Sequence, residues 1–98
     1  MASVSWTEQA LEDLDAVCLF IARDAPHVAS LFAVQAFEAT DRLEEHPRLG
    51  RMVPELQIET FREIPLYSYR VIYRIIDEEK IHILTIHHGA RLLHRGDL

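Results

Sequence analysis

The residues best suited to chemistry lie in the C-terminal third of this 98-residue chain. Arg70 and Arg74 stand four positions apart in an apolar alternation that predicts a strand, so their side chains should share one face at a spacing of roughly 13 Å. Arg91 follows the next predicted strand and is expected to join that face. A guanidinium stays charged and donates two parallel hydrogen bonds, so these arginines could bind a phosphate or a carboxylate. The alternative is that each forms salt bridges with the chain's own acidic residues.

Two adjacent histidines, His87 and His88, offer a second possible chemistry. Histidine titrates near neutral pH, so either side chain could act as a general base. Neighbours on a strand point to opposite faces, so the pair cannot bind one metal ion together, and no nearby cysteine or carboxylate spacing predicts a zinc site. The alternative is a purely structural, hydrogen-bonded role. The sequence therefore predicts no metal and no cofactor.

Cys18 is the only cysteine, and it falls on the apolar stripe of a predicted helix. We therefore expect a small core side chain rather than a nucleophile. A single cysteine excludes an internal disulfide and favours the reducing environment of the cytoplasm. No apolar run reaches the length of a membrane span, and the first residues lack the pattern of a secretion signal.

The net charge of −6 is unevenly distributed along the chain. Residues 1–60 carry four arginines against eleven acidic residues, whereas residues 61–98 carry six basic against five acidic residues. Lys80 is the only lysine. Proteins that bind nucleic acid through its phosphates usually present many cationic groups, so tight general binding to RNA or DNA is disfavoured. Any anion-binding role must be local and based on arginine.

The hydrophobic pattern predicts a single α+β domain over residues 1–98. Two amphipathic helices should form an antiparallel hairpin; Thr7 caps the first, with Ser5 and Glu8 as an alternative capping box. The predicted elements are a strand at 2–6, a helix that ends at 24–26, a helix at about 26–45, a loop at 47–55, and strands at about 58–65, 69–76 and 81–88. The polar turn 77–80 makes the last two strands an antiparallel hairpin.

The last two predicted strands are apolar on both faces, as expected when one face meets the helices and the other meets a partner or a ligand. In addition, four apolar residues of the helices miss the core stripe or lie at its margin: Leu19, Phe20, Leu31 and Val34. Single exposed apolar residues are ordinary in proteins. Several on one helical hairpin indicate a partner surface.

Several segments, taken in order, resemble the RelE/ParE superfamily of toxins from bacterial toxin–antitoxin pairs. They are Trp6-Thr7 followed by Ala10-Leu11-Glu12-Asp13-Leu14, Pro47-Arg48-Leu49-Gly50-Arg51, Arg62-Glu63, Tyr69-Arg70-Val71-Ile72-Tyr73-Arg74, and His88-Gly89-Ala90-Arg91. The resemblance covers nearly the whole chain. It implies a β-α-α-β-β-β fold, in which an N-terminal strand and a helical hairpin precede a mainly antiparallel sheet from three C-terminal strands.

Two activities occur in this superfamily. RelE-like members cleave messenger RNA on the ribosome, using arginines on the concave sheet face, basic loops, and a general base near the C-terminus that is often a tyrosine or a histidine. ParE-like members lack that set and inhibit DNA gyrase. An antitoxin whose C-terminal segment wraps around the toxin neutralises both kinds, so the resemblance implies a hetero-oligomer with a cognate antitoxin.

By their place in the motifs, Arg70 and Arg91 match RelE catalytic arginines. However, no tyrosine follows Tyr73, and the lysines expected for ribosome binding are absent. The resemblance therefore favours a ParE-like gyrase inhibitor without catalytic chemistry. Its implied target-binding residues are Arg62, Arg70, Arg74 and Arg91, and its implied antitoxin-binding residues are Leu19, Phe20, Leu31, Val34 and Ile72.

Two alternatives stay open. The first is a ribosome-dependent, metal-independent endoribonuclease whose candidate catalytic residues are Arg70, His87, His88 and Arg91. The second is a non-toxic relative that retains only antitoxin binding.

Overall fold

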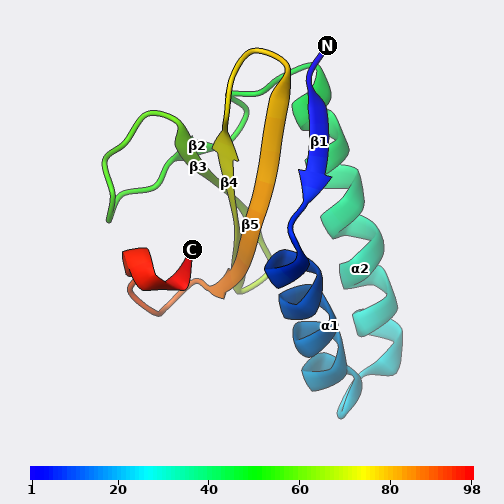
Figure 1. The fold of residues 1–98 in the computed structure, drawn as a ribbon. Helices are drawn as coiled ribbons and strands as arrows, with labels where there is room; N and C mark the ends of the chain where they lie inside the picture. The colour runs from blue at the N-terminus through cyan, green and yellow to red at the C-terminus, as the bar shows by residue number, and fades with distance from the viewer.

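A computed structural model describes all residues of the chain, 1–98, as a five-stranded sheet with a helical hairpin on one face (Figure 1). The predicted α+β class is confirmed, as is the order of strand, two helices and C-terminal strands. The elements are β1 (Ser3–Trp6), α1 (Glu8–Ala22), α2 (Pro26–Asp41), the 3₁₀ helix η1 (Arg42–Glu44), β2 (Arg51–Met52), β3 (Phe61–Leu66), β4 (Tyr69–Ile75), β5 (Lys80–His88) and the 3₁₀ helix η2 (Arg95–Asp97).

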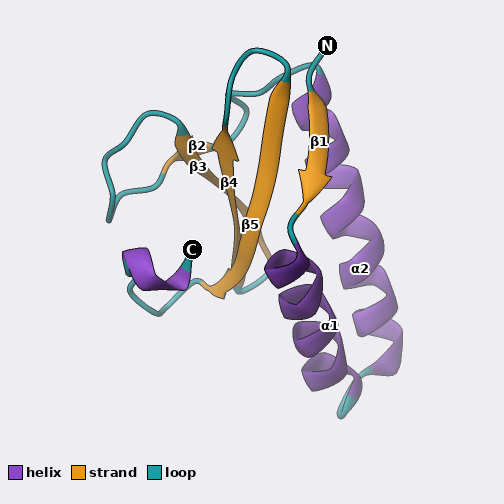
Figure 2. Cartoon of the chain, in the orientation of Figure 1, coloured by secondary structure: helices purple, strands orange, loops and turns teal.

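The sheet has the strand order β1-β5-β4-β3-β2. The N-terminal strand β1 runs parallel to β5, and every other neighbouring pair is antiparallel (Figure 2). The register of the parallel pair starts at Ser3 opposite Lys80 and ends at Trp6 opposite Ile83. The first and the last strand of the chain are therefore neighbours inside one sheet.

Local sequence explains where the helices begin and end. The side-chain oxygen of Thr7 accepts a hydrogen bond from the backbone N–H of Ala10 at 3.1 Å, so Thr7 is the cap of α1. Pro26 occupies the first turn of α2, where its missing N–H has no cost. The α-helical part of α2 ends at Asp41, earlier than the predicted boundary of 45, because the chain tightens into η1 before the loop.

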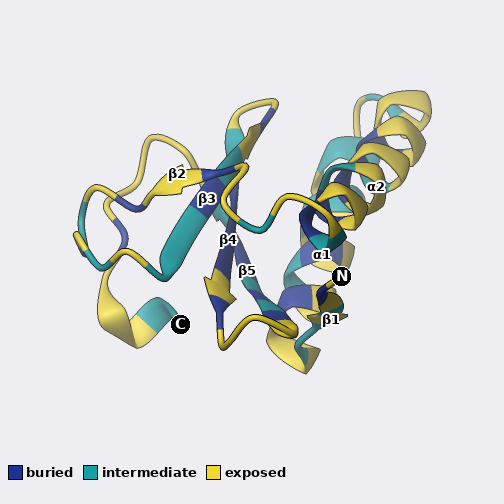
Figure 3. Cartoon of the chain, turned by 90° about the horizontal axis from the view of Figure 1, so that it is seen from above, coloured by how far each residue is buried: buried dark blue, intermediate teal, exposed yellow.

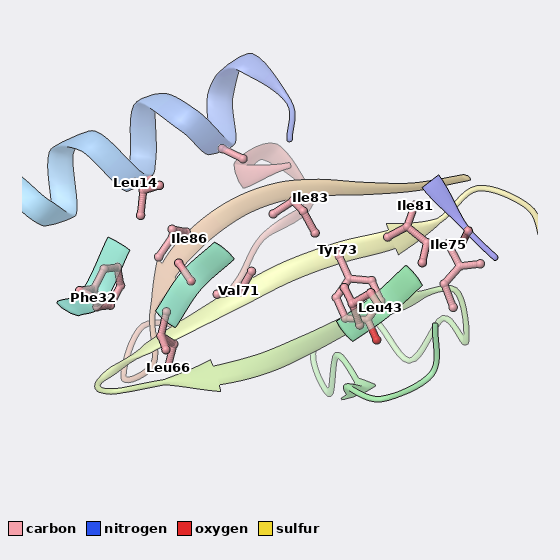
Figure 4. Packing of buried hydrophobic residues seen from close by; sticks show 13 residues of the cluster. Leu14, Phe32, Leu43, Leu66, Val71, Tyr73, Ile75, Ile81, Ile83 and Ile86 are labelled. Carbon is pink, nitrogen blue, oxygen red and sulfur yellow. The ribbon is translucent and has the colours of Figure 1, made fainter. Parts of the chain in front are cut away.

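The main core lies between the helices and the sheet. Figure 4 shows side chains from β4 and β5 meeting those of α1, α2 and η1. Its thirteen buried members are Ala2, Ala10, Leu14, Phe32, Ala36, Leu43, Leu66, Val71, Tyr73, Ile75, Ile81, Ile83 and Ile86. Cys18 packs against this cluster half-buried, as the helical stripe predicts. Each large apolar side chain that leaves water stabilises the fold by roughly 1.5–3 kcal/mol.

A second, smaller cluster lies on the opposite face of the sheet. Val53, Ile72 and Leu93 are all buried there, and Leu56, Phe61 and Leu98 pack around them. The loop after β2 and the C-terminal tail supply this cover, and Figure 1 shows both on the side of the sheet away from the helices. The prediction that this face meets a partner or a ligand is therefore wrong around Ile72, because the chain covers that part itself.

The burial pattern follows from these two clusters. Figure 3 shows the buried β4 between its neighbours, with exposed residues along the outward sides of α1 and α2.

The strand predicted from residue 58 begins only at Phe61 in the structure. The N–H of Phe61 donates a hydrogen bond to the carbonyl of Ile58 at 3.0 Å, so the residues between them form a turn.

The loop predicted at 47–55 contains the short strand β2, and Gly50 brings it against the sheet. A Cβ atom at Gly50 would lie 2.5 Å from the carbonyl oxygen of Glu63, so only glycine fits this close approach. The hydroxyl of Tyr73 accepts a hydrogen bond from the N–H of Gly50 at 2.9 Å. The same hydroxyl donates to the carbonyl of Pro47 at 2.7 Å, so one core tyrosine holds both ends of the turn.

We expect Tyr73→Phe to lower the free energy of unfolding by about 1–3 kcal/mol, because it leaves two backbone groups without their partner. Urea denaturation followed by circular dichroism measures this change. Tyr67→Phe is the matched control, since Tyr67 is 55% exposed and should show almost no effect. Equal stability of the two variants would contradict the role assigned to the Tyr73 hydroxyl.

Candidate functional site

Arg70, the residue predicted to bind an anion, is bound instead by carboxylates of the chain itself. Its side chain is only 10% exposed. Its two terminal nitrogens donate to the two oxygens of Glu55 at 3.0 and 2.9 Å, which is the bidentate geometry of a strong ion pair. A second carboxylate, that of Glu63, lies 3.3 Å from the same guanidinium. Arg70 is therefore neutralised inside the protein.

Glu63 extends this pair into a network of four charged residues. Its side chain is 3% exposed, and Arg51 contacts it at 2.7 Å from the solvent side. Two arginines and two glutamates carry a net charge of zero together, so no positive charge is left over for a phosphate. One oxygen of Glu63 and the Nε of Arg70 are buried without a hydrogen-bond partner. The network is thus held by charge and close packing more than by complete hydrogen bonding.

Glu55 also fastens the C-terminal tail. Its carboxylate accepts a hydrogen bond from the backbone N–H of Leu93 at 2.9 Å. The hydrogen bond from Arg70, aided by the one from the Leu93 N–H, lowers the pKa of Glu55 from 4.5 to about 2, although partial burial opposes the shift. The same contact raises the pKa of Arg70. Glu55 therefore stays ionised and links the tail to the sheet.

The other predicted target-binding arginines do not form one site with Arg70. Arg62 pairs with Glu59 at 3.0 Å and donates to the carbonyl of Gly50 at 2.8 Å, so it supports the loop. Arg74 shares the outer face of β4 with Arg70, as predicted, but it is exposed and lies over the ring of Phe61 at 5.3 Å. Of the four arginines named from the sequence, only Arg74 and Arg91 form no ion pair.

His87 and Arg91 do come together, in a polar groove at the end of β5. The Nε2 atom of His87 lies 3.2 Å from the carbonyl oxygen of Arg91. The groove has a volume of about 690 Å³, and its other lining residues are Gln9, Asp13, Thr85, Ile86, Leu92, His94, Gly96 and Asp97. Sequence reasoning missed the contributions of α1 and the tail, because nothing in the pattern indicates that they meet beside β5.

His88 points away from His87, as the strand geometry predicts. Its ring packs edge-on against Tyr69 at 5.3 Å between centroids, and its Nδ1 accepts a hydrogen bond from the N–H of Ala90 at 3.2 Å. These contacts suit a structural residue that closes the last strand. No group of three histidine, cysteine or acidic side chains is placed to hold a metal ion.

The predicted partner surface on the helices is exposed. The exposed fractions are 63% for Leu19, 61% for Phe20, 43% for Leu31 and 53% for Val34. Ile72, the fifth residue of that prediction, is fully buried under Val53 and Leu93 and is not accessible. Neither helix is long and apolar enough to cross a membrane.

Comparison with known proteins identifies the family. Residues 4–93 match the family model described as the ParE toxin of the type II toxin–antitoxin system parDE. The chain belongs to the ParE toxin family. Toxin RelE2 of Caulobacter vibrioides is 37% identical over 92 residues, which cover 94% of this chain and 100% of that protein.

A solved structure supports the same relationship. The structure of the chromosomal ParDE toxin–antitoxin system from P. aeruginosa superposes with a TM-score of 0.70 at 28% identity, and covers 90% of this chain and 96% of its own. The resemblance seen in the sequence motifs is thus confirmed, and so is the ParE-like fold with its N-terminal strand, helical hairpin and mixed sheet. In this ParE-family chain, Arg70, a candidate catalytic residue of the ribonuclease alternative, is paired and buried.

We expect Arg70→Ala to lower the free energy of unfolding by about 3–5 kcal/mol, because Glu55 would lose its only cation and the buried Glu63 would keep only Arg51. Chemical denaturation measures the difference. Arg48→Ala is the matched control. Arg48 pairs with Glu59 at 2.6 Å on the solvent-exposed surface, so its removal should change the free energy of unfolding little. An Arg70→Ala protein as stable as the control would contradict a structural role for Arg70.

The shifted pKa of Glu55 predicts a specific acid sensitivity. Because the folded pKa of about 2 lies below the ordinary value of 4.5, the carboxylate stabilises the fold above about pH 4.5. This contribution is lost as the pH falls through about 2. We expect an NMR titration of the Glu55 carboxyl to show its midpoint near 2. We also expect the stability difference between the parent and Glu55→Gln to shrink over this range. A midpoint at the ordinary value would contradict the pairing with Arg70.

Proposed function

We propose that this ParE-family toxin acts without catalytic chemistry by binding DNA gyrase in the cytoplasm and arresting DNA replication, and that a cognate antitoxin neutralises it. The observation that carries the proposal is the state of Arg70. A catalytic arginine must contact the scissile phosphate through a guanidinium that is not already paired with carboxylates of the protein. Here the guanidinium is buried between Glu55 and Glu63, so a phosphate could approach it only after the ion pairs break.

The charge of the chain supports the same proposal. A protein with a net charge of −6 and a single lysine meets long-range repulsion from the strongly negative ribosome. The chain has no tyrosine after Tyr73 that could serve as a general base. A target made of protein, rather than RNA, suits a chain with so few cationic groups for contacts with phosphates.

The ribonuclease alternative has one observation in its favour. His87 and Arg91 line the same open groove, and the related toxin from Caulobacter vibrioides carries the name RelE2. In that reading, His87 is the general base, and Arg91 alone stabilises the charge that builds on the phosphate. The groove also contains Asp13 and Asp97, whose negative charges oppose the entry of RNA.

The antitoxin site proposed here is the exposed apolar surface of the helical hairpin. Leu19, Phe20, Leu31 and Val34 present large apolar side chains to solvent on α1 and α2. An amphipathic helix of the antitoxin can bury such a surface, and an extended segment can continue along the sheet. Ile72 is not part of this site unless the tail first leaves the outer face of the sheet.

Gyrase supercoiling of relaxed plasmid, with the purified toxin added at increasing concentration, tests the proposal. We expect inhibition that the antitoxin relieves, and we expect His87→Ala to inhibit as well as the parent because no proton transfer is involved. Unaffected gyrase would overturn the proposal. In that case, messenger cleavage on translating ribosomes that Arg91→Ala abolishes would establish the ribonuclease. If neither activity is present, the chain is a non-toxic relative.

A further inference from the structure

The outer face of the sheet carries a hollow that belongs neither to the proposed antitoxin site nor to the polar groove at the end of β5. Its volume is about 310 Å³, and five of its seven lining side chains are apolar: Leu56, Ile58, Phe61, Leu84 and Leu98. The other two are Arg74 and Arg95. The hollow lies beside the small cluster of Val53, Ile72 and Leu93, whose neighbours Leu56, Phe61 and Leu98 also line it.

The backbone of β5 contributes a specific feature to this hollow. Strand pairing passes from Ile72 opposite Thr85 to Tyr73 opposite Ile83, so Leu84 is an extra residue without a partner on β4. An extra residue of this kind redirects a side chain out of the regular alternation. At Leu84 the bulge places a leucine in the wall of the hollow, on the face away from the main core.

The two arginines of the hollow are free, unlike most arginines near it. Arg48, Arg51, Arg62 and Arg70 all pair with carboxylates. Arg74 and Arg95 form no ion pair, either with a side chain or with the terminal carboxylate of the chain. The guanidinium of Arg74 rests over the ring of Phe61 at 5.3 Å. That contact holds it beside the hollow while its donors stay available.

We infer that this hollow binds a segment of a protein partner in which an aromatic or large aliphatic side chain stands between carboxylates. The apolar walls accept the side chain, and Arg74 and Arg95 pair with the flanking acidic residues. The volume lies at the lower end of the range for ligand pockets, roughly 300–1,000 Å³, and suits one anchoring side chain better than an extended cofactor. An anchor in an apolar pocket with a charged rim is the usual form of an interface hot spot.

Charge complementarity favours an acidic occupant over a basic one. The whole chain carries −6, so a basic segment would be attracted to many places on its surface. An acidic segment is repelled by most of that surface, and two unpaired guanidiniums beside an apolar hollow give it a specific place to bind. This inference holds whichever molecule the toxin inhibits.

The test is an NMR titration of the ¹⁵N-labelled chain with an end-blocked pentapeptide that has four glutamates around a central phenylalanine. We expect shifts at Leu56, Phe61, Leu84 and Leu98, and at least tenfold weaker binding by Arg74→Ala. Arg42→Ala is the matched control, because Arg42 is also exposed and unpaired but lies on η1. It should bind like the parent.

Two control peptides separate this site from general attraction. The peptide with alanine in place of phenylalanine and the peptide with lysines in place of glutamates should both leave the four residues unshifted. The inference is overturned if the alanine peptide binds as well as the phenylalanine peptide, if Arg42→Ala weakens binding as much as Arg74→Ala, or if no shift occurs at millimolar peptide. The amide spectrum of each variant shows directly whether it is folded.

Discussion

A guanidinium that leaves water must be neutralised at close range, and in this protein that requirement falls on Arg70. Charges of this kind are stable in an interior only when a carboxylate meets them with good geometry. Glu55 and Glu63 meet Arg70 from the loop and from β3, Arg51 closes the network from β2, and the tail joins through Leu93. Four other segments of the chain are therefore linked to the buried charge of Arg70 on β4.

This dependence explains why the fold has two apolar clusters instead of one. The helices cover one face of the sheet, and the network brings the loop and the tail across the other, where Val53 and Leu93 bury Ile72. Arg70, a candidate catalytic residue in the sequence, is therefore part of the scaffold in this structure. What stays at the surface is a set of exposed apolar side chains on the helical hairpin, a polar groove beside β5, and a hollow with two free arginines.

Periodicity predicted the parts of this structure that local sequence controls. Helix caps, helical stripes and strand alternation depend on neighbours within a few residues. The sequence therefore predicted correctly that Thr7 caps α1, that Leu14 lies in the core, and that Arg70 and Arg74 share one face of β4. The partners of Arg70 could not be found that way. Glu55 reaches it only because the loop crosses the sheet, and the path of a loop has no periodic signal. For the same reason Ile72 looked accessible in the sequence.

The parallel pairing of β1 with β5 has a consequence for how the chain folds. Thr7 and Leu84 form a hydrogen bond across 77 residues of sequence, and every residue of β1 pairs with the opposite end of the chain. Contacts this distant slow the search for the native state, because a long loop must close before any of them forms. During synthesis, β1 can pair with its neighbour only after β5 has been made. The toxin therefore cannot complete its sheet on a partly made chain, and its folded form exists only after β5 has emerged from the ribosome.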